Sequence, residues 1–255
     1  MHRPLARSFR QGDDRYGVAG RQRVEPGDAE TLRLSQPVSD RVKHKRQLKM
    51  SEPNPLRVAR YQKSVHELHQ LPPDDGIEEA SAGRSNAGKS SAINAIVDQG
   101  ALARTSKTPG RTQQLVYFEV APQRFLVDLP GYGYAKVPPS LRDHWQVLIE
   151  RFFQTRQALR GLLVVMDVRH PLREFDQQML AYGSARGLAC HCLLTKADKL
   201  PRGQQSKALL ETRRTLGDSA SVQLFSATSH LGVDEARTRL SQWLELVPGA
   251  SSAAD

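Results

Sequence analysis

Eight consecutive residues match the pattern G-x-x-x-x-G-K-[ST], which is typical of a phosphate-binding loop. They are Gly83, Arg84, Ser85, Asn86, Ala87, Gly88, Lys89 and Ser90. Glycines let the backbone come close to a ligand, so its N–H groups and the positive end of the following helix face phosphate oxygens. We expect Lys89 to bridge the terminal phosphates and Ser90 to give its hydroxyl to Mg²⁺. The pattern therefore predicts a site for a nucleotide polyphosphate with magnesium.

The stretch LVDLPGYGYAK supplies a second group suited to phosphate chemistry. Asp128 closes an apolar run, and Gly131 follows it after Leu129 and Pro130. Beside a phosphate loop, this carboxylate can hold a Mg²⁺ water, and the Gly131 N–H can reach a γ-phosphate. A bare D-x-x-G is common, but this one lies 38 residues after Ser90 and follows a predicted hairpin.

Two further motifs point to the base of the nucleotide. Thr195, Lys196, Ala197 and Asp198 follow an apolar run that ends at Leu194. The Asp198 carboxylate can accept hydrogen bonds from guanine N1–H and the 2-amino group, whereas adenine has neither donor. The Lys196 stem can lie along the base. A short loop formed by Phe225, Ser226 and Ala227 can offer a backbone N–H to guanine O6. These residues predict a guanine-nucleotide site.

A long connection, Gln99 to Gln113, contains ARTSKTPGRTQ and has no regular apolar period. Loops of this length in compact domains are usually functional. We expect Thr112 to complete the Mg²⁺ shell when γ-phosphate is present, with Thr105 and Thr108 as alternatives. The segment would then be an order-to-disorder switch that a partner reads.

Apolar periodicity places these motifs in an α/β fold of alternating strands and helices. Expected strands are 77–82, 115–120, 125–129, 162–166, 189–194 and 222–225, and expected helices are 56–71, 88–97, 174–186, 204–216, 233–246 and one after Pro138-Pro139 carrying Leu141, Trp145, Leu148 and Phe152. Ile77 to Ala82 reads as a weak strand because Glu78, Glu79 and Ser81 dilute it. The expected architecture is a three-layer sandwich: a mostly parallel six-stranded sheet with helices on both faces and ligands at the carboxyl ends of its strands.

Composition divides the 255-residue chain unevenly. Residues 1–49 hold 12 of the 37 Lys and Arg against 6 of the 27 Asp and Glu, and they lack sustained periodicity. We expect this part to be a disordered basic extension or a mis-assigned start, with the working protein beginning near Met50; an RNA-binding basic arm is the alternative. A helix and linker would occupy 50–75, a nucleotide-binding domain 76–247 and a disordered tail 248–255.

The cysteine content and the apolar runs exclude several protein classes. Only Cys190 and Cys192 are present, which excludes a disulfide framework and fits a reducing cytoplasm. His191 lies between them, but on a strand it would face away from both thiols, so we expect buried small residues rather than a metal site. The longest apolar run, Leu162 to Met166, is far too short for a membrane span, and the N-terminus has no secretory h-region.

The segments GRSNAGKSSAIN, ARTSKTPGRTQ, DLPGYGYAKVP, DVRHPL and LLTKADKL together resemble the EngB/YsxC family of bacterial GTPases, a branch of the Era-like phosphate-loop group. The resemblance spans about Leu56 to Leu246. It implies a Mg²⁺-dependent GTP-binding protein that acts in assembly of the large ribosomal subunit, with rRNA and ribosomal proteins as partners, and is needed for normal cell division and septation. We expect a cytoplasmic monomer.

The resemblance places family site residues on Gly83 to Ser90, Asp128 to Gly131, Thr195 to Asp198 and Phe225 to Ala227. It adds Gly110, Arg111, Thr112, Gln113 and Gln114 in the connection. This chain departs from the family at Glu79 and Ser81, where the first strand is usually more apolar, at Thr228, and in its N-terminal extension. None of these residues is expected to touch the phosphates.

Three positions bear on turnover. Many small GTPases have a glutamine after the D-x-x-G glycine to orient water, and this chain has Tyr132, so we predict slow intrinsic hydrolysis. Tyr132 and Tyr134 either pack on the adjacent helix or offer aromatic surface to RNA or protein. In related GTPases an asparagine at the place of Asn86 helps coordinate K⁺, and we hypothesise the same here. Arg169 and His170 in DVRHP are expected to support the switch rather than act in catalysis.

Two other classes of function remain open from the sequence. A phosphoryl-transfer enzyme such as a nucleotide kinase would need an arginine lid, and nothing distinguishes Arg202, Arg213 and Arg214 from ordinary arginines. Asp198 also argues against ATP as the nucleotide. A binding module that keeps nucleotide for structure alone would unfold on loss of Lys89 without a separate effect on ribosome assembly.

Overall fold

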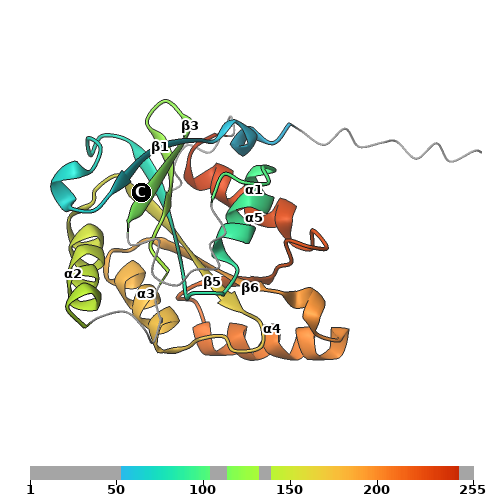
Figure 1. Ribbon diagram of the computed structural model, residues 1–255. Helices are drawn as coiled ribbons and strands as arrows, with labels where there is room; N and C mark the ends of the chain where they lie inside the picture. Colours follow the sequence, from blue (N-terminus) through green and yellow to red (C-terminus); the bar gives the residue numbers. More distant parts are fainter. Residues whose placement is uncertain (1–52, 104–113, 132–138, 247–255) are drawn as a thin grey trace, which may run out of the picture. The chain divides into compact units, whose positions relative to one another are not determined.

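The computed structural model describes residues 53–103, 114–131 and 139–246, all within Ser51–Asp255, the second of the two units into which the chain divides. In this part of the chain seven strands form one sheet in the order β1-β3-β4-β2-β5-β6-β7 (Figure 1). Their bounds are β1 Arg60–Val65, β2 Ile77–Gly83, β3 Leu115–Ala121, β4 Arg124–Asp128, β5 Leu159–Asp167, β6 Ala189–Thr195 and β7 Ser221–Leu224. The pairs β2–β4, β2–β5, β5–β6 and β6–β7 are parallel, and β3 pairs antiparallel with β1 and β4. The prediction of a mostly parallel sheet is confirmed.

Helices cover both faces of this sheet, as predicted for a three-layer sandwich. The described helices are α1 Lys89–Val97, α2 Pro139–Thr155, α3 Glu174–Ala185, α4 Arg202–Leu216 and α5 Val233–Trp243, with short 3₁₀ turns η1 Pro55–Val58, η2 Leu68–Gln70 and η3 Ala197–Lys199. Figure 1 shows α1 and α5 side by side on one face and α2 and α3 on the other. The five long helices agree with the periodicity to within a few residues at their ends.

The predicted helix Leu56 to Leu71 is wrong, and so is the count of six strands. The structure has β1 there, flanked by η1 and η2. β1 pairs antiparallel with β3, and Arg60 donates to Glu119 across the pair at 2.6 Å. Only Val65 of this strand is buried. The open edge of the β3–β4 hairpin supplies backbone partners, and they outweigh the local helical pattern.

β2 is the central strand of the described sheet and is buried along its whole length, although it carries two carboxylates. Glu78 meets the guanidinium of Arg156, which follows α2, with N–O distances of 2.5 and 3.0 Å. Arg156 also donates to the Pro72 carbonyl at 2.8 Å. Glu79, on the opposite face, accepts from the Ser81 hydroxyl at 2.9 Å. Arg156 offsets the cost of burying Glu78, and the Ser81 hydroxyl bonds one oxygen of Glu79, so the segment remains a strand despite the residues that weakened its sequence signal.

The Glu79 carboxyl should make stability depend on pH. Its burial raises the pKa to about 8 from the ordinary value of 4.5, and the Ser81 hydrogen bond opposes this. Between these values the folded state keeps a proton that the unfolded chain releases, so the group's contribution is complete below pH 4.5 and is lost as pH rises through 8. We expect wild-type unfolding free energy to fall by roughly 1 kcal/mol per pH unit in this window relative to Glu79→Gln. Urea melts from pH 5 to 8 measure it.

Glu211→Gln, which changes an exposed carboxylate on α4, is the control for this experiment and should follow the wild-type pH dependence. Parallel curves for wild type and Glu79→Gln would contradict the assigned protonation of Glu79.

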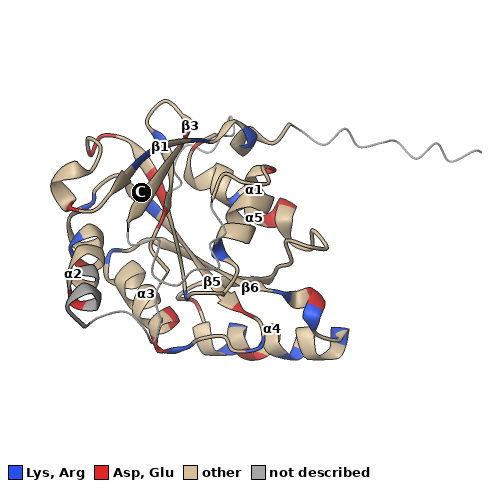
Figure 2. Ribbon diagram, viewed as in Figure 1, with Lys and Arg blue, Asp and Glu red and all other residues tan. Residues whose placement is uncertain are grey.

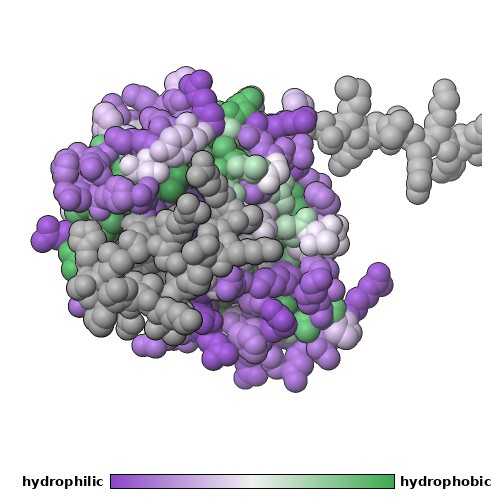
Figure 3. All heavy atoms as spheres, in the orientation of Figure 1, coloured by the Kyte–Doolittle hydropathy of each residue, from purple (hydrophilic) through white to green (hydrophobic). Residues whose placement is uncertain are grey.

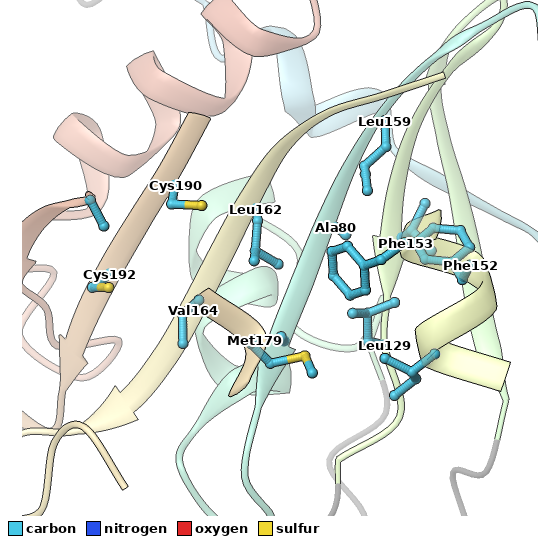
Figure 4. Packing of buried hydrophobic residues seen from close by; sticks show 14 of the residues in the cluster. Ala80, Leu129, Phe152, Phe153, Leu159, Leu162, Val164, Met179, Cys190 and Cys192 are labelled. Carbon is cyan, nitrogen blue, oxygen red and sulfur yellow. The ribbon is translucent and has the colours of Figure 1, made fainter. Parts of the chain in front are cut away.

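Apolar side chains form one core on each face of the sheet. One core lies against α1 and α5. The other, shown in Figure 4, joins side chains of β2, β5 and β6 to those of α2 and α3; it includes Ala80, Phe152, Phe153, Leu162, Val164, Met179, Cys190 and Cys192. Both cysteines are buried free thiols in this core. His191 instead contacts Ser221 and Gln223, and the described residues contain no group of three or more metal-ligating side chains. The prediction that both cysteines are buried is confirmed.

The described surface is predominantly hydrophilic on the face drawn in Figure 3. The large exposed apolar side chains of the described residues are Val58, Tyr61, Val147, Leu210 and Leu231. Basic side chains recur along α4 (Figure 2), where Arg202, Lys207, Arg213 and Arg214 are exposed. No helix in the described ranges has the length and apolarity to cross a bilayer.

Candidate functional site

The phosphate-loop residues form a tight turn between β2 and α1. Gly83 ends β2, where a Cβ would lie 2.8 Å from the Val165 carbonyl oxygen, so the close approach of β5 requires glycine. Gly88 has φ of +96°, in the left-handed region, and Asn86 has φ of +62°. α1 begins at Lys89, directly after this turn. The sequence therefore folds here into a loop whose backbone precedes a helix N-terminus, which is an arrangement suited to phosphate.

Lys89 and Asp128 form a buried ion pair beside this loop. Asp128 ends β4, and the next residue, Leu129, donates its N–H to the Ser81 carbonyl at 3.0 Å, which holds the end of β4 against β2. Gly131 is close to the loop, since a Cβ on it would lie 3.5 Å from the Gly83 carbonyl oxygen. The structure thus brings the G-x-x-x-x-G-K-S and D-x-x-G motifs together.

The donor set of this corner fits a polyphosphate with a divalent cation. The Ser85 hydroxyl is buried and has no hydrogen-bond partner among the described residues. A buried hydroxyl usually has a partner, and a phosphate oxygen could accept from this one. Lys89, the Ser90 hydroxyl in the first turn of α1, and Asp128 add the cation and oxygen groups that Mg²⁺-phosphate sites use.

Thr195 and Lys196 connect the end of β6 to the phosphate loop. The Thr195 hydroxyl lies between the carbonyls of Ala87 and Met166, the latter at 2.9 Å. Lys196 has φ of +59°, and its ammonium donates to the Asn86 carbonyl. A Cβ on Gly88 would be 3.5 Å from the Thr195 hydroxyl. Two motifs more than a hundred residues apart are therefore in direct contact.

Asp198 is held by the loop that follows β7. The Ser226 hydroxyl donates to Asp198 at 2.7 Å, and this hydrogen bond lowers the pKa of that carboxyl below its ordinary value. Ser226 is fully buried, and it accepts the Ser229 N–H at 3.1 Å. The Ala197 N–H donates to the Phe225 carbonyl at 3.1 Å. The carboxylate is thus ionised and aimed by its neighbours rather than free to rotate.

Asp167, at the end of β5, belongs to this site but was missed in the sequence. It accepts from the Lys196 ammonium at 3.0 Å and from the Arg169 guanidinium at 2.9 and 2.6 Å. The Arg169 hydrogen bond, with Lys196, lowers the pKa of Asp167 below its usual range, although burial opposes the shift. The DVRHP segment contains Asp167, but its partner Lys196 lies 29 residues further along the chain. Arg169 and His170 are both exposed.

Of the remaining predicted site residues, the structure describes Gln114 but not those before it in the connection. Gln114 is partly buried directly before β3. Gly110, Arg111, Thr112 and Gln113 lie outside the described residues, as do Thr105, Thr108, Tyr132 and Tyr134. The described motifs all lie at the carboxyl ends of β2, β4, β5, β6 and β7, where ligands of α/β proteins bind.

Comparison with known proteins agrees with this geometry. Residues 79–196 match the family described as 50S ribosome-binding GTPase. The "Probable GTP-binding protein EngB" of Stenotrophomonas maltophilia is 62% identical over 192 residues, which cover 74% of this chain and 96% of that protein. The chain belongs to the EngB family of GTP-binding proteins. EngB of Xylella fastidiosa is 60% identical over 197 residues, covering 76% of this chain and 97% of that protein.

The fold agrees with an EngB structure as well. A crystal structure described as a probable GTP-binding protein EngB superposes with a TM-score of 0.54 at 17% identity, covering 67% of this chain and all of that one. At that identity the likeness concerns the fold alone. The EngB fold is thus a phosphate-loop GTPase fold with helices on both faces of a mostly parallel sheet.

Proposed function

We propose that this EngB-family chain is a Mg²⁺-dependent switch that binds GTP and GDP, hydrolyses GTP slowly and acts in assembly of the large ribosomal subunit. The observation that carries the nucleotide part is the Lys196 bridge. Its ammonium reaches the carbonyl of Asn86 in the phosphate loop, while Asp198, two residues on, is held by Ser226. One short segment therefore joins the groups suited to phosphate with the groups suited to guanine.

In this proposal each motif has one role. Lys89 and the backbone of Gly83–Ser90 hold the phosphates, and Gly131 donates its N–H to the γ-phosphate. Ser90 and Thr112 ligate Mg²⁺, and Asp128 holds one of its waters; the cation offsets phosphate charge. Gly110, Arg111, Gln113 and Gln114 flank Thr112 in the connection that would respond to γ-phosphate. The geometry of the motifs supports the roles of the described residues, and the family resemblance supports those of residues 110–113.

Asp198 and Ala227 would read the base. Asp198 accepts from guanine N1–H and the 2-amino group. The N–H of Ser226 already donates to the Leu231 carbonyl at 2.9 Å. Ala227 is therefore the residue of Phe225–Ala227 that we assign to guanine O6, while Thr195, Lys196 and Ala197 frame the base from β6.

The hypothesis that Asn86 helps coordinate K⁺ can be tested by GTP turnover. We expect GTP turnover to be several-fold faster in KCl than in NaCl at equal ionic strength, since K⁺ at Asn86 would add positive charge near the phosphates. Asn86→Gly tolerates the φ of +62° and keeps the carbonyl that Lys196 contacts, so it should abolish the salt difference and keep GDP affinity. Equal wild-type rates in the two salts would remove K⁺ from the proposal.

The partner we propose is a precursor of the large ribosomal subunit, through rRNA and ribosomal proteins. The family description names 50S ribosome binding. The exposed basic residues of α4 carry positive charge, which attracts the phosphate backbone of rRNA. Because ribosomal precursors are cytoplasmic particles, we propose that the protein acts in the cytoplasm. We propose that it does so as a monomer. Cell division and septation would depend on the protein through this assembly step.

Calorimetry and sucrose gradients test the two halves of this proposal. Nucleotide-stripped protein should bind GDP and GTP with Mg²⁺ at micromolar affinity and show no heat with ADP or ATP. Equal affinity for adenine nucleotides would indicate a kinase-like enzyme instead. In cells depleted of this protein, sucrose gradients should show fewer mature large subunits, and expression of the wild-type protein should restore them. The wild-type protein should also cosediment with large-subunit precursors. Normal gradients on depletion would leave a nucleotide-binding protein without the proposed ribosomal role.

A further inference from the structure

The side-chain amide of Gln223, in β7, has a fixed orientation. Its nitrogen donates to the Gly232 carbonyl at 2.7 Å and lies 3.3 Å from the Leu224 carbonyl. Both groups are acceptors, so the NH₂ must be on this side. The amide oxygen therefore faces His191, whose Nε2 lies 2.8 Å away. Gln223 is buried, with 4% of its surface exposed.

The orientation of Gln223 determines the tautomer of His191. Nε2 must carry the proton that is donated to Gln223, so Nδ1 is the acceptor and receives the Ser221 hydroxyl at 2.7 Å. Burial lowers the pKa of His191 to about 4, and Arg239 contributes to this lowering. The imidazole is thus neutral near pH 7, which leaves Nδ1 without a proton and able to accept from the Ser221 hydroxyl.

Gly232 closes the loop that contains the proposed base-reading residues. Its φ is +73°, and a Cβ on it would lie 2.2 Å from the Leu224 carbonyl oxygen, so the close return of the chain requires glycine. Just before it, Leu231 accepts the Ser226 N–H at 2.9 Å. The near end of the loop is tied by the Phe225 N–H, which donates to the Leu194 carbonyl at 2.9 Å. The far end is tied to the sheet through Gln223.

We propose that His191 and Gln223 are positioning residues for guanine recognition, holding loop 226–231 so that Ser226 aims Asp198 and Ala227 meets the base. Neither residue touches the nucleotide. Their hydrogen bonds run from β6 through β7 to Gly232, which is a path that apolar packing would not provide. Buried polar side chains cost stability unless they are satisfied, and here the bonds of His191 and Gln223 connect β6 and β7 to Gly232 at the end of the loop. This inference rests on the proposed guanine site.

The test compares His191→Leu with His191→Gln and with Cys192→Ala. Leucine fills the space but donates nothing, whereas the glutamine amide can donate to Gln223 and accept from Ser221. Cys192 lies on the same strand, is fully buried and has its side chain in the opposite core, so its truncation is a control for lost packing. Gln223→Met, of similar length, is a second variant that removes the bond to Gly232.

Two measurements separate positioning from packing. GDP and IDP titrations should show about tenfold weaker GDP binding and a smaller preference for GDP over IDP in His191→Leu and Gln223→Met, with near wild-type values in His191→Gln and Cys192→Ala. Amide hydrogen exchange at Ser226, which needs no nucleotide, should be faster in the first two variants only.

Loss of thermal stability in His191→Leu and Gln223→Met, with GDP affinity, base preference and Ser226 exchange all as in wild type, would overturn the proposal. If the wild-type protein bound no GDP, this result would contradict the proposed function, whatever the role of His191 and Gln223. Exchange at Ser226 would still report whether His191 and Gln223 hold the loop, so the two failures can be told apart.

Discussion

Asp198→Asn is expected to weaken GDP binding by about a thousandfold, because two charge-assisted hydrogen bonds to the guanine edge are lost. The asparagine oxygen can still accept from Ser226, whose hydroxyl lies 2.7 Å from the wild-type carboxylate, so the side chain should keep its place. Its new NH₂ group can donate to the 2-oxo group of xanthine. The variant should therefore bind XDP better than GDP, and calorimetry with both nucleotides measures the reversal.

Asp218→Asn, an exposed carboxylate after α4, is the matched control and should keep wild-type GDP affinity. In cells depleted of the native protein, Asp198→Asn should restore large-subunit profiles only when xanthine nucleotide is supplied. GDP affinity within a few-fold of wild type in Asp198→Asn would remove Asp198 from base recognition.

Arg156→Leu should lower the unfolding free energy by about 3–5 kcal/mol, since it leaves the Glu78 carboxylate buried without its charged partner. Glu78 is fully buried, and Arg156 is 4% exposed. The same change also frees the carbonyls of Pro72 and Pro73, which the guanidinium holds at 2.8 and 3.0 Å. Denaturant unfolding monitored by circular dichroism measures the loss.

Arg151→Leu makes the same substitution at an exposed position of α2 and should change stability little. The double variant Arg156→Leu with Glu78→Leu should recover much of the loss, because no unpaired charge remains. If the double variant were no more stable than Arg156→Leu, the cost would come from packing rather than from the isolated carboxylate.

The sequence predicted best those parts of the site that depend on local chemistry. A turn with Gly83 and Gly88, followed by Lys89, is typical of a phosphate-binding loop. The apolar runs also predicted Asp128 at the end of a strand and Asp198 in the turn that follows another strand. Asp167 was missed because its role depends on Lys196, 29 residues later, and on Arg169 bending back to it. Nothing in the local pattern of DVRHP distinguishes that carboxylate from an ordinary strand end.

The errors in the fold have a similar cause. Residues 60–65 were predicted to be helical, yet they pair with residues of β3 that lie fifty or more positions away. Glu78 weakened the apolar pattern of β2. Its partner, Arg156, lies 78 residues further along the chain, so nothing in the local sequence indicated that the carboxylate would be paired. Local periodicity cannot report such partners, whereas β5 and β6 were visible from their own apolar runs.

The position of β2 between β4 and β5 has a consequence for biosynthesis. Its register partners Arg124–Asp128 and Leu159–Val165 leave the ribosome after it does. A nascent chain that ends at Ser90 therefore contains the whole phosphate-loop sequence but none of the neighbouring strands that shape it. The residues proposed to read the base follow β6 and β7, so we expect a guanine base to be bound only after β7 has emerged.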